Sequence, residues 1–289
     1  MSEYLGFRLC NLIIPGDPEE LELKTPSGIW HLERESRYAE VKQAIEQGQI
    51  GETYCLMTNV VVGQSGRSAA LDAVCDELVP ICLAASYLTG ASVAITRSLP
   101  HSECTFVEVG PHFPRPRAMQ GVDAAVTTQQ EFTERVEAFV RNHPSTGLAE
   151  KDRLLVHHWI DAVACWSMED LCLSTATLLE IIAATANRTG TTAGQTLKSF
   201  NQRIQFAATR FALSALSADF RNMRNDLVHE GTLSIKSFPN KSNADCAKAV
   251  AEALHWIDQY IHAALGLGPL VNNRFPANTF RGLNAFSLD

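Results

Sequence analysis

The sequence lacks several patterns that would point directly to a common chemistry. Its 289 residues contain neither a GxxxxGK[ST] nor a GxGxxG phosphate loop, and they contain no GxSxG or HExxH motif. No stretch approaches the roughly 20 consecutive apolar residues of a membrane span. We therefore expect no P-loop or dinucleotide-binding chemistry, no metal site, no bound cofactor and no membrane partner.

Cysteine use is equally uninformative about metals. The eight cysteines form no CxxC pair, so the common zinc and redox spacings are missing. Two pairs, Cys75 with Cys82 and Cys165 with Cys172, are seven residues apart, which predicts one helix face and buried thiols. The first residues lack the charged and apolar regions of a signal peptide. Together these features predict a reduced, cytoplasmic protein.

Positive charge is scarce in the first half of the chain. Residues 1–150 carry 11 basic and 20 acidic side chains, a net charge of −9, whereas residues 151–289 carry 13 and 12, a net charge of +1. Because phosphate binding depends on Lys and Arg, the first half is a poor surface for nucleic acid. The second half is nearly neutral and suits a local contact to a few nucleotides better than a long duplex.

The first half mixes strand and helix patterns, and the second half is helical, so the predicted fold class is α+β. Strands are expected at 5–14, 28–32, 53–62, 92–96 and 105–109, and helices at 38–47, 68–88 and 129–142. Pro80 should kink or split the second helix, and Pro144 should end the third. We predict an N-terminal α+β domain at 1–145, a helical bundle at 146–267 and a C-terminal tail at 268–289.

Within the bundle, capping residues and breaks suggest where helices begin and end. Ser167 should cap a helix that runs to about residue 186, followed by a break at 187–192. A long helical region, in one or two pieces, should end at Gly231, and Ser242 should cap the last helix. Phe275, Phe280 and Phe286 suggest that the tail docks on the protein's own fold or on a partner.

The most informative segment lies near the end of the long helical region and reads Arg224-Asn225-x-x-x-His229. Arginine can stabilise the charge on a phosphate in its transition state, and histidine can move a proton near neutral pH. Spacing alone is weak, because about 1.6 such pairs are expected by chance, and Arg153 with His158 is a second one.

Helical periodicity gives this segment two faces. Leu216, Phe220, Met223 and Leu227 recur at helical spacing and form an apolar stripe. Arg221, Asn225 and His229 are spaced i, i+4, i+8 and lie roughly 140–220° from Leu216, so they form a polar ridge opposite the stripe. Arg224 falls on the flank between the two. The ridge suits a ligand or a second subunit, or it is an ordinary solvated face.

The segment from Arg224 to His229 resembles the R-x4-6-H signature of HEPN domains, which often have a polar residue after the arginine. The surrounding order of helices is also similar: a Trp-containing helix at 156–160, a Leu-Glu helix at 178–182, the motif helix and a final amphipathic helix. The likeness spans roughly residues 151–267. Toxins controlled by a nucleotidyltransferase partner carry R-x4-H-x-Tyr, and Gly231 stands where that tyrosine would be.

The resemblance implies a homodimer whose two motifs meet in one cleft, and a metal-independent endoribonuclease of the phage-defence or toxin type. In that reading the ribose 2′-OH of an RNA substrate attacks the adjacent phosphate. His229 acts as general acid or base, Arg224 stabilises the phosphorane, and Asn225 positions substrate or orients the imidazole. Arg221 adds a phosphate contact, an assignment that comes from the periodicity rather than from the family. The N-terminal domain would bind a trigger or regulator.

Two other readings remain open from the sequence. The motif helix can belong to a non-catalytic module for dimerisation or for binding RNA or a nucleotide, and the acidic overall charge favours this alternative. Alternatively, the protein is a toxin silenced by a neighbouring protein.

Overall fold

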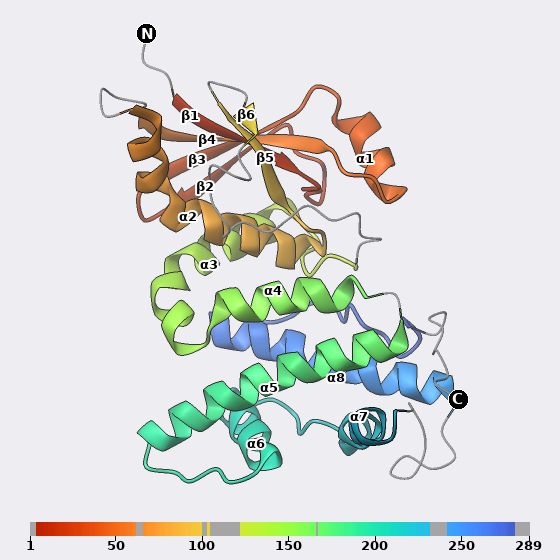
Figure 1. The fold of residues 1–289 in the computed structure, drawn as a ribbon. Helices are drawn as coiled ribbons and strands as arrows, with labels where there is room; N and C mark the ends of the chain where they lie inside the picture. The colour runs from red at the N-terminus through yellow and green to blue at the C-terminus, as the bar shows by residue number, and fades with distance from the viewer. Residues whose placement is uncertain are drawn as a thin grey trace. The chain divides into compact units, whose positions relative to one another are not determined.

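The structure is a computed structural model, and it describes residues 4–61, 66–99, 103–104, 122–165, 167–231 and 242–280 (Figure 1). The chain divides into two compact units, Met1–Ser145 and Thr146–Asp289. The first unit contains a β-sheet with helices and the second is built from helices alone in its described part, so the fold class is α+β as predicted.

The first unit is organised around a six-stranded antiparallel sheet with the order β2-β3-β4-β1-β5-β6. Its strands are β1 (Tyr4–Cys10), β2 (Glu20–Thr25), β3 (Gly28–Arg34), β4 (Glu52–Val61), β5 (Ala94–Leu99) and β6 (Glu103–Cys104). Its helices are α1 (Tyr38–Glu46), α2 (Gly66–Thr89) and α3 (Gln129–Ala149), the last of which continues into the second unit.

Alternation of apolar and polar residues sets which face of the sheet is buried. In β2, Leu21 and Leu23 are buried while the glutamates beside them are exposed. Trp30 and Leu32 of β3 extend the same buried layer. Figure 1 shows α2 running across one face of this sheet. The core of the first unit therefore lies between that face and the helices.

The strands expected at 5–14, 28–32, 53–62 and 92–96 are present, with ends shifted by a few residues. Strand β2 was not predicted, although it alternates perfectly. Helix α2 is not split, because it continues through Pro80 to Thr89. The strand expected at 105–109 lies outside the described residues.

The predicted end of α3 before Pro144 is wrong, because the helix continues to Ala149. The guanidinium of Arg188 donates hydrogen bonds to the carbonyl oxygens of Leu148 (2.8 Å) and Ala149 (2.7 Å). These are carbonyls of the last turn, which have no partner inside a helix. A contact between distant parts of the sequence thus satisfies the last carbonyls of α3, whereas the local sequence predicted an earlier end of the helix.

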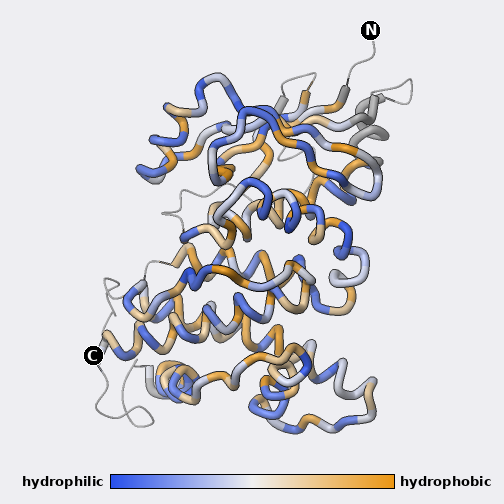
Figure 2. Tube along the Cα trace, turned by 180° about the vertical axis from the view of Figure 1, so that it is seen from behind, coloured by the Kyte–Doolittle hydropathy of each residue, from blue (hydrophilic) through white to orange (hydrophobic). Residues whose placement is uncertain are grey.

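The second unit contains the helices α4 (Asp152–Val163), α5 (Met168–Thr192), α6 (Phe200–Arg210), α7 (Ala218–Glu230) and α8 (Asn243–Leu265). Their inward faces are apolar, with Trp159, Leu179 and Ile257 almost fully buried. Figure 2 shows hydrophobic and hydrophilic positions alternating along these helices, as expected for elements that bury one face.

The start of α5 was predicted correctly, since Ser167 accepts a hydrogen bond from the backbone N–H of Asp170. The break expected at 187–192 is wrong, because α5 continues to Thr192. The hydroxyls of Thr191 and Thr192 donate to carbonyls one turn earlier, which satisfies these side chains without ending the helix. The long region after it forms two helices, α6 and α7, and Ser242 caps α8 in a capping box.

The connection from α5 to α6 folds back onto α5 at Gly190. A Cβ atom on Gly190 would lie 2.7 Å from Cδ1 of Leu197, closer than real Cβ contacts allow. Glycine at this position therefore lets Leu197 pack against α5. Because α6 begins only three residues later, this contact helps to place the first residues of α6 beside α5.

The tail docks on the fold of its own unit. Arg274 forms two hydrogen bonds to the carboxylate of Asp258 on α8, at 2.9 and 2.7 Å, and both side chains are fully buried. Its guanidinium also lies 4.3 Å from the centre of the Trp159 ring. Phe275 is buried against the same tryptophan, whereas Phe286 lies outside the described residues.

The two predicted cysteine pairs differ in the structure. Cys75 and Cys82 lie on α2, but Cys165 follows α4 while Cys172 lies on α5, so the second pair does not share a helix. In the described ranges, no helix combines the length and the hydropathy needed to cross a bilayer.

Candidate functional site

Helix α7 carries every residue of the predicted site, and both of its ends are fixed locally. Ser217 caps its start by accepting a hydrogen bond from the backbone N–H of Asp219 at 3.2 Å. Gly231 ends it with φ +71°, a left-handed conformation that favours glycine, and donates its N–H to the carbonyl of Leu227. The predicted end at Gly231 is confirmed.

The buried face of α7 is largely the predicted apolar stripe. Phe220 and Met223 are 2% and 0% exposed, and Leu227 is 7% exposed. Leu216 does not belong to the helix, because α7 begins at Ala218; it lies half-buried in the preceding segment. The face also includes Asp226, which is 3% exposed and was not expected to be buried.

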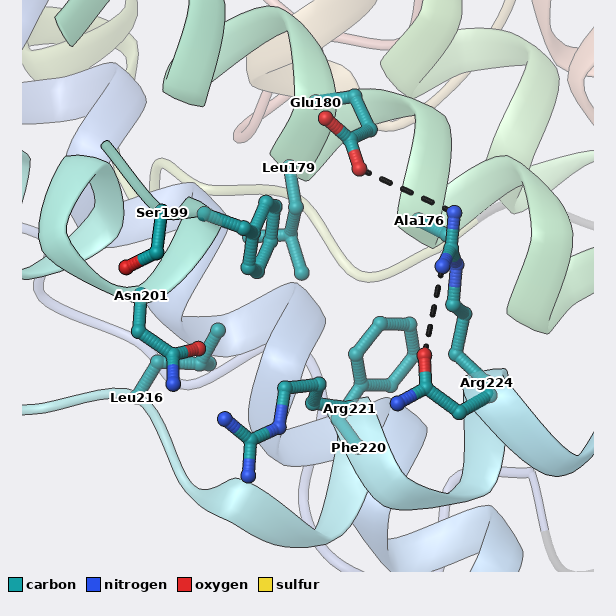
Figure 3. A pocket seen from close by; sticks show the side chains of 11 residues that line it. Ala176, Leu179, Glu180, Ser199, Asn201, Leu216, Phe220, Arg221 and Arg224 are labelled. Carbon is teal, nitrogen blue, oxygen red and sulfur yellow. Dashed lines mark hydrogen bonds and ion pairs between the residues drawn. The ribbon is translucent and has the colours of Figure 1, made fainter. Parts of the chain in front are cut away.

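A pocket of about 300 Å³ lies between α5, the start of α6 and α7 (Figure 3). Its apolar lining consists of Ala176, Leu179, Phe200, Leu216 and Phe220. Its polar lining consists of Glu180, Ser199, Asn201, Arg221, Arg224 and Asn225. Three of the four predicted site residues therefore meet at one cavity within the second unit.

The side chain of Arg224 is held on two sides. Its Nη2 lies 3.8 Å from Oε1 of Glu180 on α5, and its Nη1 donates to Oδ1 of Asn225 at 3.4 Å. Both contacts are drawn as dashed lines in Figure 3. The Glu180 side chain is 54% exposed, so this ion pair contributes little to stability. Together with the contact to Asn225, it orients the Arg224 side chain, which lines the pocket.

Arg221 and His229 are different, since neither has a hydrogen bond or ion pair with any residue that the structure describes. Arg221 is half-buried and lines the pocket, and Figure 3 shows its guanidinium pointing away from Glu180. His229 is exposed and does not line the pocket. It follows Asn225 by one turn, a rise of about 6 Å along the helix.

The polar ridge is therefore divided by the fold. Arg221 and Asn225 face the cavity, and His229 continues the same row onto solvent-exposed surface beside Val228, which is 46% exposed. The structure brings Arg224 together with Arg221 and Asn225. It leaves His229 outside the cavity that the other three share.

Sequence reasoning missed the residues that other helices contribute to the pocket. Glu180 and Phe200 are the most informative of these, because one orients Arg224 and the other adds an aromatic wall. Ser199 forms a capping box with Gln202, and that Ser-x-x-Gln pattern locates the start of α6 in the sequence. It does not reveal that α6 starts beside α7.

The cysteines near this site are poor nucleophiles. Burial raises the pKa of the Cys172 thiol to about 12, and the nearby guanidinium of Arg224 lowers it by less. A thiol with such a pKa carries almost no thiolate at neutral pH. Within the described ranges, no cluster of three or more His, Cys, Asp or Glu side chains is arranged to hold a metal ion.

Comparison of this chain with protein-family models, with curated proteins and with solved structures gave no match.

Proposed function

We propose that this protein is a metal-independent endoribonuclease of HEPN type, acting as a phage-defence or toxin effector, and that α7 carries its active site. The single observation that carries the proposal is the pocket at which Arg221, Arg224 and Asn225 converge, with His229 one turn further along the same row. Two guanidinium groups in one small cavity attract a phosphate and can bind it bidentately.

The proposed reaction is attack of a ribose 2′-OH on the adjacent phosphorus. The 2′-oxygen forms a bond to phosphorus, the 5′-oxygen of the next nucleotide leaves, and a 2′,3′-cyclic phosphate remains. His229 removes the 2′ proton or protonates the leaving oxygen, since histidine can move a proton near neutral pH. Arg224, already oriented by Glu180 and Asn225, stabilises the charge that develops on the phosphorane.

A second copy of the chain completes the proposal. His229 and Val228 lie on exposed surface at the end of α7, where a twofold axis would bring two motifs together. Thiol crosslinking of a Val228→Cys protein tests this directly. We expect a covalent dimer, whereas Leu154→Cys, which is also exposed but lies on α4, should stay monomeric. Equal crosslinking of both variants would contradict an interface at α7.

The decisive experiment incubates the purified protein with structured RNA in EDTA and analyses the ends of the products. We expect cleavage that persists without divalent cations and leaves 2′,3′-cyclic phosphate and 5′-hydroxyl ends. An absolute requirement for Mg²⁺ or Mn²⁺, or products with 5′-phosphates, would rule the mechanism out. The Asn225→Asp protein is a useful companion, because it adds a negative charge beside Arg224 and should cleave more slowly.

The second candidate function is a non-catalytic module that binds RNA or a nucleotide. The observation in its favour is the position of His229, which is outside the cavity lined by the two arginines. If this function is correct, the protein binds RNA, Arg221→Ala weakens the binding, and no product forms under any metal condition. The ribonuclease proposal includes a trigger or regulator bound by the N-terminal unit, and comparing cleavage in extracts with and without phage infection tests it.

A further inference from the structure

The pocket beside α7 has an apolar interior, which the binding of a phosphate alone does not require. Its deepest lining is apolar, because Ala176, Leu179 and Phe220 are 8%, 1% and 2% exposed. Phe200 and Leu216 are only half-buried and form apolar walls nearer to the opening. Figure 3 shows the Phe220 ring between the side chains of Arg221 and Arg224. A phosphate bound by the arginines would leave this apolar interior empty.

An apolar interior beside two arginines suits a nucleotide, which joins a flat base to a phosphate. A nucleobase has two flat π-faces that stack on aromatic side chains, and it carries a phosphate a few bonds away. A volume of about 300 Å³ is at the lower end of small-molecule sites, so it suits one ring system rather than two stacked bases. Phe200 supplies a partly exposed aromatic ring on the wall.

The polar side chains of the pocket can bind the phosphate and the polar edge of the base. Arg221 has no partner among the described residues, so it is available to a phosphate without breaking an existing contact. Asn201 is exposed at the opening, and its amide offers both a donor and an acceptor to the edge of a base. The N-terminal end of α6 adds a modest positive potential beside these side chains.

We propose that this pocket binds one unpaired nucleobase of an RNA strand, stacked on Phe200, while Arg221 holds the adjoining phosphate. The proposal rests on the ribonuclease function proposed above and makes the pocket the site that selects which nucleotide sits beside the cleaved bond. A base inside a duplex is stacked on both sides and cannot enter. The substrate at this site is therefore a single-stranded loop or a flipped-out nucleotide.

Binding can be measured without cleavage in the full-length His229→Ala protein. The probes are a fluorescein-labelled ten-nucleotide single-stranded RNA and a strand of the same length whose sugars carry no bases. In this background, Phe200→Leu removes the aromatic ring but keeps an apolar side chain of similar size. Arg221→Ala removes the charge. Phe206→Leu is the matched control, because Phe206 lies on the same helix but does not line the pocket.

Loss of stacking and loss of charge should change the affinities for the two strands in different ways. Phe200→Leu should weaken binding of the base-containing RNA by roughly 5- to 100-fold and leave the abasic strand unaffected. Arg221→Ala should weaken both strands similarly and lower the dependence of log affinity on log salt by about one. Phe206→Leu should change neither affinity. Thermal unfolding of each variant confirms that the fold is intact.

The outcomes separate this inference from the ribonuclease proposal. Equal effects of Phe200→Leu on both strands, or no effect on either, would overturn the base pocket even if the wild-type protein cuts RNA. A Phe200 effect confined to the base-containing strand supports the base pocket even if RNA stays uncut. Adenosine monophosphate, used as a competitor, tests whether the pocket binds a free nucleotide instead of a nucleotide of an RNA strand. If it binds with the same Phe200 dependence while RNA does not bind, the pocket serves free nucleotides and the RNA assignment is wrong.

Discussion

The two units of this protein use their charged side chains in different ways. In the first unit, the carboxylate of Glu77 accepts hydrogen bonds from four donors: the backbone and hydroxyl of Ser27, the hydroxyl of Thr25 and the indole of Trp30. Asp17 is likewise engaged by Lys42 and Tyr38. In the second unit, α7 presents Arg221 to the pocket and His229 to the solvent, and neither has a partner among the described residues.

This difference indicates what each set of charges is for. A carboxylate that accepts several hydrogen bonds fixes the loops and strands around it, and removing it costs stability. An arginine that has no partner among the described residues and is half-buried beside an apolar cavity contributes little to the fold and remains available to a ligand. The contrast also exists inside the second unit, where Arg274 is buried and paired with Asp258, while Arg221 has no partner among the residues that the structure describes. Substitutions at each kind of site should therefore separate stability from function.

The largest effect should come from His229→Ala. We expect a loss of about 10²–10⁴-fold in RNA cleavage, which is typical when a general acid or base is removed. Stability should change by less than about 0.5 kcal/mol, because His229 is exposed and makes no described contact. The measurements are initial cleavage rates and urea unfolding.

Leu227→Ala is the matched control for His229→Ala on the same helix. Leu227 is 7% exposed, so its truncation should leave a cavity and cost about 2–5 kcal/mol. If His229→Ala unfolds the protein as readily as Leu227→Ala does, the histidine is a structural residue. The ribonuclease proposal would then lose its catalytic base.

The next effect concerns the two arginines of the second unit. Arg274→Ala should destabilise the protein by about 3–5 kcal/mol, because it removes the guanidinium that is paired with the buried carboxylate of Asp258. Arg221→Ala should change stability by less than about 0.5 kcal/mol. Urea unfolding of both variants measures the difference.

A double variant sharpens the arginine comparison. Replacing the pair together, as Arg274→Met with Asp258→Leu, removes both charges and keeps an apolar filling against Trp159. We expect this protein to recover most of the stability lost by Arg274→Ala, since buried ion pairs are often replaceable by packed apolar side chains. A double variant as unstable as the single one would show that stacking of the guanidinium on Trp159 matters more than the charge balance.

The sequence predicted those elements whose signals are local. The apolar stripe of α7, the cap at Ser242 and the stop at Gly231 follow from periodicity and capping chemistry alone. Strand β2 was missed even though Leu21 and Leu23 alternate with polar residues, because a six-residue edge strand carries a weak pattern. Asp226 lies three residues after Met223 and so shares its buried face. A hydrophobicity pattern does not predict its burial, because its side chain is polar.

The errors at helix ends and in the pocket have a common physical origin. Past Pro144, the last carbonyls of α3 accept hydrogen bonds from Arg188, which is about forty residues away in the sequence. The pocket wall formed by α6 is placed in part by Leu197, which packs at Gly190 and brings the start of α6 beside α5. Such long-range contacts leave no periodic signal. The residues that α7 presents could therefore be predicted, whereas the walls they face could not.

The smallest of the expected effects concerns Glu77 in the first unit. Burial alone would raise the pKa of Glu77, but the hydrogen bonds from Ser27, Thr25 and Trp30 outweigh it and lower the pKa below its usual 4.5. A carboxyl group whose pKa is lower in the folded state stabilises the fold above its unfolded pKa, and this stabilisation is lost as the pH falls through the folded pKa.

Glu77→Gln keeps the size of the side chain but removes the charge that these donors share. It should therefore cost about 1.5–3 kcal/mol at pH 7, the range for hydrogen bonds to a charged group, and less at pH 3, because the stabilisation by the charge is lost as the pH falls from the usual 4.5 through the lower pKa of the folded state. Urea unfolding at both pH values measures the two differences, and Glu46→Gln, at an exposed position of α1, is the control that should change little at either. A cost for Glu77→Gln that stays constant from pH 7 to pH 3 would mean that the shape of the side chain matters here rather than its charge. The contrast between structural charges in the first unit and available groups on α7 would then not hold for Glu77.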